Sequence, residues 1–509
     1  DRPVSSSRRS FLQSTALASA GLLGSLHGQA SFAQDGAPSW MRAYAADTTG
    51  DGVLSPADRQ VVEAALFSRR GFQLMPNPEF DIRADVLGRG VVDRDVLEWV
   101  SRAVAETGGR LGLYDRRPIT VAWHYGWYNR VTRPPGLQTV GLLGGDYASW
   151  DHNVEGQFNR LKNEFGITVD ALSWITARDN FDLLRNYRSG YFQADQLETR
   201  YAALLYESTI SLPMQGARVD LRSPLVQELI VQDFEEMAMF FREMRDSSVR
   251  VFNLDERPVI FLFGSHTWGL FSRLAQQSDA LDRILQLARE RFARIYGSFP
   301  YLVGEEVLRS FETELDESRW RRMVNFDAIC TYHHATNMKK GPTVELPVGS
   351  WYIQNQVKAL RKTISAVRWV ANRYTKNPIL IIPNLAPGFA KPGYPSLTMN
   401  RGSYLDLMRA VQHVYVNEYL VPYWGAKFGT SLLPAPVYVV GSWNEEWEGH
   451  CVFPSRFNLA LNSDNQHGFG IPMAIKQMFG WNHYATRPIS DGFMNRTDLD
   501  ENRINTWGR

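Results

Sequence analysis

The sequence has little cysteine, no excess of charge of either sign and no long apolar run. Its 509 residues include two cysteines, Cys330 and Cys451. Cys330 lies inside an apparent strand, where a buried thiol is the expected state, and a disulfide with Cys451 is the alternative in an oxidising compartment. The formal net charge is +1 with both signs interspersed, so no nucleic-acid partner is expected. No segment of the main body approaches the ~20 apolar residues of a membrane-spanning helix, so no span is expected.

Three catalytic signatures are also missing. No G-x-G-x-x-G motif follows the first predicted strand, which counts against a dinucleotide-binding fold, and no organic cofactor is expected. No G-x-S-x-G elbow is present, so serine-nucleophile chemistry is not favoured. The adjacent His333 and His334 would point to opposite faces of a strand, and no H-x-H or H-E-x-x-H arrangement occurs. A catalytic metal is therefore not expected in the main body.

The N-terminus predicts export. Residues 7–12 read Ser-Arg-Arg-Ser-Phe-Leu, an Ala/Gly/Leu-rich stretch follows from Ala16 to Leu26, and Ser31-Phe32-Ala33 supplies the small residues of a cleavage site. We interpret residues 1–33 as a twin-arginine signal peptide, with a disordered basic tail as the alternative. The mature protein, starting near Gln34, is then expected to be periplasmic or secreted.

Residues 34–110 resemble a small helical calcium-type module of the EF-hand or dockerin kind. The segment Asp47–Asp58 places oxygen-bearing side chains at positions 1, 3, 5, 9 and 12 of an EF-hand-like loop, and Gly52 at its sharp turn. The predicted Ca²⁺ ligands are Asp47, Thr49, Asp51, Ser55 and Asp58.

A second loop, Asp85–Asp93, repeats this shape with Leu87 and Arg89 at two ligand positions, so no metal is expected there. The final Asp58, where a full EF-hand has Glu, is similar to the dockerin type of loop. A dockerin fold implies a cohesin-type partner, although such paired loops also serve as spacers beside catalytic domains.

From about Arg117 onward, short apolar runs alternate with longer helical patterns, which is typical of a parallel sheet. Eight strands are predicted, at Ile119–His124, Val169–Ile175, Tyr201–Tyr206, Pro258–Phe263, Pro300–Gly304, Phe326–Tyr332, Ile379–Pro383 and Val437–Ser442. Eight strand–helix units predict the fold class α/β, as a (β/α)₈ TIM barrel over residues 115–488, with a doubly wound open sheet as the alternative. Residues 489–509 form a polar tail that is expected on the surface.

One helix of this pattern is predicted in detail. Pro224–Arg245 begins with Ser223 as N-cap and Pro224 at the first helical position. Its predicted apolar face consists of Leu225, Leu229, Ala238, Phe241 and Met244.

In such a barrel, active-site groups lie at the carboxyl ends of the strands. The predicted strand ends collect polar and aromatic side chains, and aromatic residues make up 12% of the chain. Because Trp and Tyr faces stack on sugar rings, this composition fits a glycan-binding cleft. The predicted substrate-binding residues are His124, Tyr125, Trp127, Glu207, His266, Tyr332, His333, Trp443, Asn444 and Trp447.

Two carboxylates three residues apart follow the last predicted strand, in the segment Trp443-Asn444-Glu445-Glu446-Trp447-Glu448-Gly449. Carboxylate pairs perform acid/base chemistry on glycosidic bonds, and flanking Trp side chains favour the protonated form that a general acid needs. The predicted catalytic residues are Glu445 and Glu448, which share a face if the loop is helical. If the loop is extended, Glu446 aligns with Glu448 instead. A solvated acidic turn is the alternative.

Three motifs resemble glycoside hydrolase family 99. They are His124-Tyr125-Gly126-Trp127-Tyr128, the strand Ile167–Trp174, and Asn444-Glu445…Glu448-Gly449, and the resemblance spans about Ile119 to Tyr484. The family motif reads roughly Asn-Glu-Trp-His-Glu-Gly, whereas here Trp is displaced by one position and His is lost. The resemblance implies a retaining, endo-acting α-mannosidase or mannanase on a (β/α)₈ barrel, and the departure from the motif leaves the substrate open.

The same resemblance implies roles for individual carboxylates. Glu445 would act as a base on the sugar 2-hydroxyl, giving a 1,2-anhydro sugar, and Glu448 would be the general acid/base. Glu207 matches a carboxylate of the substrate cleft. The sequence therefore predicts an exported glycoside hydrolase that cleaves internal bonds of a polysaccharide or glycan. A non-catalytic glycan-binding or scaffold protein is the alternative, because the catalytic motif is altered; export away from nucleotide sugars argues against a glycosyltransferase.

Overall fold

The structure of the chain is a computed structural model. It describes residues 46, 48, 53–69, 84, 91–107, 109–110, 118–128, 147–176, 181–195, 197, 200–216, 218–247, 249–268, 274–306, 317–330, 344–346, 351–374, 379–389, 397–425, 436–445, 451–453 and 470–479. The chain divides into two compact units, one formed by Asp1–Asp115 with Gln412–Pro434 and the other by Arg116–Val411 with Ala435–Arg509.

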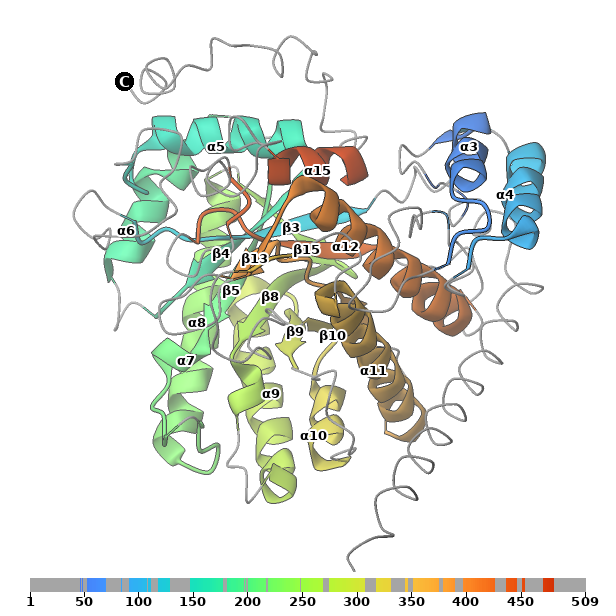
Figure 1. Cartoon of the computed structure of the whole chain (residues 1–509). Helices are drawn as coiled ribbons and strands as arrows, with labels where there is room; N and C mark the ends of the chain where they lie inside the picture. The colour runs from blue at the N-terminus through green and yellow to red at the C-terminus, as the bar shows by residue number, and fades with distance from the viewer. Residues whose placement is uncertain are drawn as a thin grey trace, which may run out of the picture. The chain divides into compact units, whose positions relative to one another are not determined.

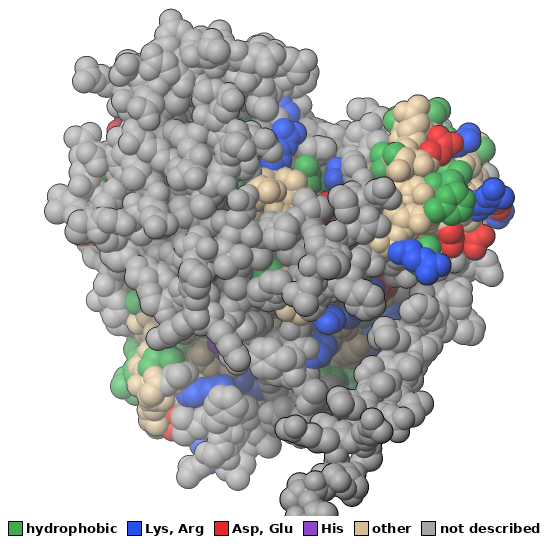
Figure 2. Space-filling model, viewed as in Figure 1, with side chains coloured by type: hydrophobic (Ala, Val, Ile, Leu, Met, Phe, Trp, Pro, Cys, Tyr) green, Lys and Arg blue, Asp and Glu red, His purple; other side chains and the backbone are tan. Residues whose placement is uncertain are grey.

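Among its described residues, the first unit contains the α-helices α3 (Pro56–Ala64) and α4 (Arg94–Thr107) and a short antiparallel pair, β1 (Val53–Leu54) with β2 (Gly109–Arg110) (Figure 1). Its small core joins aliphatic side chains of both helices, among them Val62, Val96 and Val100. Charged side chains of both signs lie on the surface of α3 and α4. Figure 2 shows them in the same view as Figure 1, where the two helices are labelled. The segment η9 (Tyr415–Gly425), a π-helix, also belongs to this unit.

Helix α3 begins with a capping box. The Ser55 hydroxyl accepts a hydrogen bond from the Ala57 N–H at 3.2 Å, and the Asp58 carboxylate accepts one from the Ser55 N–H at 2.8 Å. These contacts satisfy N–H groups that the first turn of a helix leaves without backbone partners. Of the predicted calcium ligands, Ser55 and Asp58 thus lie at the start of α3, whereas Asp47, Thr49 and Asp51 lie outside the described residues.

The second unit is built on eight parallel strands, and this confirms the predicted TIM barrel. In spatial order they run β12-β10-β9-β8-β5-β4-β3-β15. Their bounds are β3 (Ile119–His124), β4 (Val169–Trp174), β5 (Tyr201–Glu207), β8 (Arg257–Phe263), β9 (Tyr301–Glu305), β10 (Ala328–Cys330), β12 (Leu380–Ile382) and β15 (Val437–Ser442). Each predicted strand is present; β10 begins at Ala328 rather than at the predicted Phe326, and residues 331 and 332 of the predicted strand lie outside the described residues.

Hydrogen bonds between β15 and residues 383–385, which directly follow β12, close the barrel. The Val439 N–H donates to the Pro383 carbonyl at 2.9 Å, and the Val439 carbonyl accepts from the Leu385 N–H at 2.7 Å. Strand β15 pairs with β3 on its other side, from Val437 opposite Ile119 onward. The doubly wound open sheet is therefore excluded, since its edge strands would not pair with each other.

Helices follow the strands in alternation, so the strands can run parallel (Figure 1). The described helices of this unit are α5 (His152–Phe165), α6 (Phe181–Ser189), η3 (Tyr191–Gln193), α7 (Ser208–Ser211), α8 (Pro224–Asp246), η5 (Ser265–Thr267), α9 (Leu274–Tyr296), α10 (Glu317–Arg322), η7 (Met323–Asn325), α11 (Trp351–Arg373), α12 (Arg401–Val414) and α15 (Gly470–Phe479). The remaining short strands are β6 (Arg250–Val251), β7 (Asn253–Leu254), β11 (Val344–Leu346), β13 (Gly388–Phe389) and β14 (Leu397–Met399).

Helix α8 is where the predicted helix lies, but part of its predicted apolar face is wrong. Leu225 is 57% exposed, and the buried face carries Val226, Ile230, Phe234, Met237, Phe241 and Met244. Those positions recur every three or four residues, as a single helical stripe requires. The predicted set combined residues that lie on different faces of the helix. Ser223 is the N-cap residue, although its side chain makes no capping hydrogen bond.

Both cysteines are buried free thiols, as predicted for Cys330, so the alternative disulfide is not formed. Helices in the described part of the chain lack the combination of length and apolar character that crossing a bilayer demands.

Gly304 of β9 tests the packing between the barrel and its helical layer. A Cβ at this position would lie 2.3 Å from Cδ2 of the buried Phe326 ring. We expect Gly304→Ala to destabilise the barrel by about 1–3 kcal/mol, because the ring must move within a close-packed interior. Urea unfolding followed by tryptophan fluorescence would measure the change. Phe326→Leu in the same chain should recover part of it, so that the double variant is less destabilised than the sum of the two single variants; additive effects would contradict this packing.

Candidate functional site

The carboxyl ends of three barrel strands carry nearly buried carboxylates. Glu207 ends β5, Glu305 ends β9, and Glu445 follows β15. Glu207 pairs with Phe263 of β8, and Leu262 pairs with Gly304, so Glu207 and Glu305 lie at the same level on either side of β8. β15 is four strands away from β8 in both directions around the barrel. The carboxylates therefore occupy opposite sides of one end of the barrel, where TIM-barrel sites are found.

A bulge in β15 sets the direction of the residues that follow it. Val439 lies opposite Val121, but Ser442 rather than Gly441 lies opposite Trp123, so one extra residue is inserted. Gly441 has φ of 100°, in the region that glycine adopts readily. A bulge shifts the alternation of side chains along a strand by one position. As a result Trp443 points to the outer side of the barrel, where its ring lies 5.6 Å from that of Phe158 on α5.

Asn444 ties the end of β15 to the end of β3. Its Oδ1 accepts the Tyr125 N–H at 2.9 Å, and its Nδ2 donates to the Tyr125 carbonyl at 2.8 Å and to the Tyr147 hydroxyl at 3.1 Å. Both amide hydrogens of this buried side chain are thus used within the protein. Asn444 was predicted to bind substrate; its contacts instead give it the task of holding the neighbouring Glu445 in place.

Glu445 is held by its backbone and contacted through its side chain. Its N–H donates to Oγ of Ser442 at 3.1 Å, which closes a turn at the end of the strand. The Tyr128 hydroxyl donates to Oε1 of Glu445 at 3.4 Å. Glu207 is fixed in a comparable way, because Oγ of Ser173 donates to its Oε1 at 2.9 Å. The second predicted catalytic residue, Glu448, lies outside the described residues, between Glu445 and the segment 451–453 that pairs with Ser442.

Two other predicted substrate-binding residues lie on the outer side of the barrel wall. His124 and Trp443 have no exposed surface, and both pack against α5. Consecutive residues of a strand point to opposite faces, so His124 faces the helices while Trp123 faces the interior and lies 4.9 Å from the Phe261 ring. The expectation that His124 and Trp443 contact substrate is therefore corrected.

Among the described candidates, Trp127 and His266 are half-buried, and Tyr125 is buried with its ring 4.4 Å from that of Trp127. Tyr332, His333 and Trp447 lie outside the described residues. Within the part of the chain that the structure describes, no set of three or more His, Cys, Asp and Glu side chains is arranged to hold a metal ion.

Glu305 was not predicted from the sequence. Its Oε2 accepts the Gly264 N–H at 2.6 Å and lies 3.2 Å from Nδ1 of His266. Together with Trp123, Phe261 and Cys330 it lines a small cavity inside the barrel. The predicted strand ended one residue too early, at Gly304, and so the carboxylate at its end was overlooked. Position alone could have identified it, since Glu207 ends its strand in the same way.

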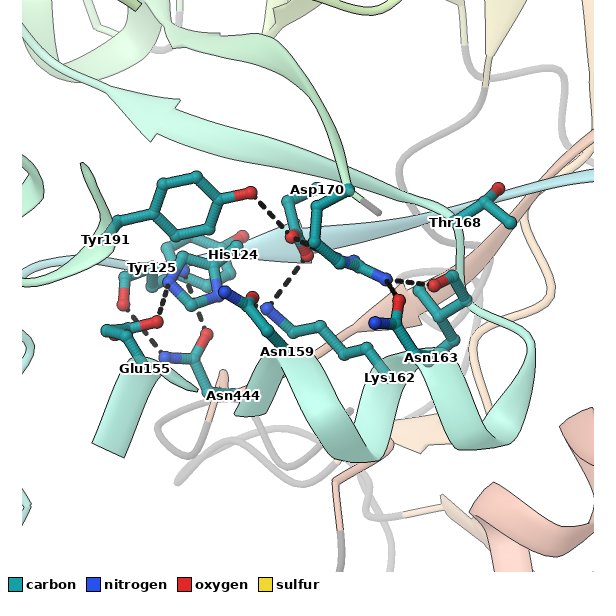
Figure 3. A network of polar contacts seen from close by, with 12 residues as sticks. His124, Tyr125, Glu155, Asn159, Lys162, Asn163, Thr168, Asp170, Tyr191 and Asn444 are labelled. Atoms are coloured by element: carbon teal, nitrogen blue, oxygen red, sulfur yellow. Dashed lines mark hydrogen bonds and ion pairs between the residues drawn. The ribbon is translucent and has the colours of Figure 1, made fainter. Parts of the chain in front are cut away.

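A buried polar network supports β3 and β4 from the outside (Figure 3). Glu155, Asn159, Lys162 and Asn163 project from α5 toward His124 and Asp170 on the two strands. Asp170 forms ion pairs of 2.8 Å with both Lys162 and Arg200. Helix α5 is well delimited, because the Asp151 side chain caps its first turn and Gly166, at φ of 77°, ends it.

The charges of this network shift the acidity of its members. Burial alone would raise the pKa of Asp170, but the positive charges of Arg200 and Lys162 outweigh burial and hold that pKa far below its ordinary value. Burial lowers the pKa of Lys162, although the Asp170 charge opposes this shift. Nζ of Lys162 donates to Nδ1 of His124 at 3.0 Å, and Nε2 of the same ring lies 3.2 Å from Glu155. In a neutral His124, the Lys162 ammonium beside Nδ1 favours the tautomer that carries its proton on Nε2.

We expect Asp170→Asn to destabilise the barrel by about 3–5 kcal/mol, because it leaves two buried cations without their shared counter-charge. The matched control is Glu243→Gln, which breaks the exposed Arg188–Glu243 pair of 2.6 Å and should cost less than about 1 kcal/mol. Denaturant unfolding of both variants measures the difference.

The stability that Asp170 contributes should also depend on pH. Its folded pKa lies below that of the unfolded chain, about 3.9, so the contribution is fully present above pH ~4 and is lost as the pH falls toward the folded pKa. The difference in unfolding free energy between wild type and Asp170→Asn should therefore be constant from about pH 5 to 7. It should shrink below pH ~4. A gap that widens on acidification would contradict the charged state of Asp170.

The comparisons with known proteins find similarity of structure. No family model matches the sequence, and curated proteins give no match. A glycoside hydrolase-like protein aligns with 72% of this chain and 94% of its own length, at 12% identity and a TM-score of 0.49. The GH99 endo-alpha-mannosidase from Bacteroides thetaiotaomicron aligns over 72% of this chain and 98% of its own, at 13% identity and a TM-score of 0.45. A GH26 beta-mannanase from Bacteroides ovatus aligns over 70% and 91%, at 11% identity and 0.33. At these TM-scores the activities of the neighbours do not transfer to this chain.

Proposed function

We propose that the chain is a glycoside hydrolase that cleaves internal bonds of a polysaccharide or glycan, with α-mannosides as the first substrates to test. The observation that supports this most is the placement of Glu445, a nearly buried carboxylate held at the end of β15 by Ser442 and contacted by the Tyr128 hydroxyl at 3.4 Å. Glu207 and Glu305 add carboxylates at the same end of the barrel. Carboxylates together with half-buried aromatic rings suit a neutral, polyhydroxylated substrate.

Glu445 and Glu448 form the proposed catalytic pair, by the resemblance of their motif. Glu445 takes the proton of the sugar 2-hydroxyl, and the 2-oxygen attacks the anomeric carbon. Glu448 donates a proton to the departing glycosidic oxygen. Glu448 then takes a proton from water, the water oxygen adds to the anomeric carbon, and the 2-oxygen recovers its proton from Glu445. Two displacements at the same carbon retain its configuration.

Three single variants separate the carboxylates of the loop. We expect Glu445→Gln and Glu448→Gln each to lower kcat by about 10³-fold or more, because each removes an acid/base group that acts in the transition state. Glu446→Gln is the matched control and should retain activity within about tenfold. The measurement is a screen of polysaccharides, α-mannans first, with chromatography of the products. A large loss for Glu446→Gln with full activity for Glu445→Gln would reassign the base to Glu446.

Binding experiments on the same polysaccharides distinguish the enzyme from a scaffold protein. The Gln variants should bind the substrate as the wild type does, because the change is nearly isosteric. Wild-type protein that binds a polysaccharide and yields no product would contradict hydrolysis and favour a non-catalytic glycan-binding protein.

We also propose a structural Ca²⁺ site in the first unit and export by the twin-arginine route. The capping contacts of Ser55 and Asp58 support the metal site, because they place both side chains at the start of a helix, where the ninth and twelfth residues of an EF-hand-like loop lie. Asp47, Thr49 and Asp51 are the other proposed ligands. The export signal in residues 1–33 implies a periplasmic or secreted protein.

Chelation should lower the melting temperature of the first unit, because Ca²⁺ binds its folded state only. Asp51→Ala should abolish this sensitivity to chelator by removing a charged ligand. Calorimetry of the full chain with calcium and with excess chelator measures the melting transition of the first unit. The polysaccharide assay under the same two conditions measures the activity of the barrel. Identical transitions under the two conditions would contradict the site, and loss of catalysis on chelation would place a metal in the barrel instead.

A further inference from the structure

Asn384 has a buried side-chain amide at the place where the barrel closes. The residue lies just after β12, between Pro383 and Leu385, whose backbone groups form the closing hydrogen bonds with Val439. Asn384 is 7% exposed, and among the described residues neither its Oδ1 nor its Nδ2 has a hydrogen-bond partner. Buried amides are nearly always hydrogen-bonded, to protein or to ordered water, because an amide without partners destabilises the fold. This amide therefore marks a place where a polar ligand can bind.

Asn384 lines a small cavity between the barrel wall and its helical layer. The cavity has a volume of about 20 Å³ and is bounded by residues of β10, β12, α11 and α12, all of which belong to the second unit. Its polar lining residues are Asn384 and, from α11, Gln356 and Thr363, and the other described lining residues are aliphatic or proline. The polar groups thus come from the closing segment on one side and from one helix on the other.

Gln356 and Thr363 have hydrogen-bonding capacity that a shared ligand can use. The Thr363 hydroxyl donates to the Ala359 carbonyl at 3.0 Å, so its oxygen can still accept a hydrogen bond. Gln356 is 5% exposed and brings a second amide, with both donors and an acceptor. A ligand that both donates and accepts hydrogen bonds can therefore join these groups to Asn384.

The size and the charge of the cavity determine which ligand it suits. One water molecule needs roughly 10–15 Å³ of such space, so the volume of about 20 Å³ holds one water and leaves no room for a sugar ring. None of the described lining residues is charged. A bound calcium ion takes about six to eight oxygen ligands, usually with carboxylates among them, so the lining does not suit a metal ion.

We propose that this cavity is a binding site for one structural water molecule, which is hydrogen-bonded by the side chains of Asn384, Gln356 and Thr363. The water links the segment that closes the barrel to helix α11. The other side of the seam has a direct link of the same kind, because the Tyr404 hydroxyl of α12 donates to the Val440 carbonyl of β15 at 3.0 Å. The site is separate from the candidate catalytic carboxylates and does not rest on the proposed function.

A high-resolution crystal structure of the full chain tests the site directly. We expect one ordered water about 2.7–3.2 Å from a side-chain atom of Asn384 and from a polar atom of Gln356 or Thr363. An Asn384 side chain without an ordered water beside it, or one bonded to a protein group instead, would overturn the proposal. A metal ion at the same position would overturn it as well.

The sign of the stability change in Asn384→Leu provides an independent test. Leucine has a similar size and no polar group, so the substitution removes the hydrogen bonds to the water. We expect the equilibrium constant for folding to fall about 5- to 30-fold, seen as a lower urea midpoint of the barrel by tryptophan fluorescence. If the amide had no ligand, its removal would leave the midpoint unchanged or raise it, and that result would overturn the proposal.

A second variant and a control separate the water from simple packing. Gln356→Leu should also lower the midpoint, and the double variant with Asn384→Leu should lose less than the sum of the two, because the same water is lost once. Additive effects would contradict a shared ligand. Leu360→Met changes only the apolar lining and should shift the midpoint less than either substitution. A larger shift for Leu360→Met would assign the effect to packing and overturn the proposal.

Discussion

The pairing of β15 with β3 on one side, and its hydrogen bonds to residues 383–385 after β12 on the other, are the contacts on which the barrel and its candidate site depend. Val439 bonds to Pro383 and Leu385 on one side, and β15 aligns with β3 on the other. Without these contacts the sheet would have two open edges. Closure also brings Asn444 beside Tyr125, which lies 319 positions earlier in the chain. Glu445 therefore reaches its place only when the whole sheet has formed, and the site is coupled to the longest-range contact that a barrel has to make.

The two faces of each barrel strand have different roles. In β3, Trp123 fills the interior and His124 enters the polar network under α5, while the Tyr125 backbone holds Asn444. Neighbouring residues thus belong to the core, to the helical layer and to the mouth. The network around Asp170 lies behind the wall that carries the site, and the two buried ion pairs that Asp170 forms with Lys162 and Arg200 restrict the positions of all three side chains.

The sequence was a good guide to the strands and a poorer one to individual side chains. Buried parallel strands are continuous apolar runs, and all eight were recognisable for that reason. Which face a residue occupies depends on register, and a bulge such as the one at Gly441 changes the register without a clear signal in the sequence. Trp443 was therefore placed at the mouth when it lies behind the wall. His124 was misplaced because it is the last residue of its strand and points outward, and Glu305 was missed because β9 is one residue longer than its apolar run.

The state of the two thiols bears on the redox conditions under which the barrel can fold. Cys330 and Cys451 are buried and unpaired with each other, and burial raises the pKa of the Cys330 thiol well above its ordinary value. Because the thiolate is the form that reacts with oxidants and disulfides, a buried thiol with a raised pKa is chemically inert. The barrel is held by hydrogen bonds, packing and ion pairs that do not change with redox potential. Its fold can be completed in a reducing compartment and kept in an oxidising one, with no covalent step between the two.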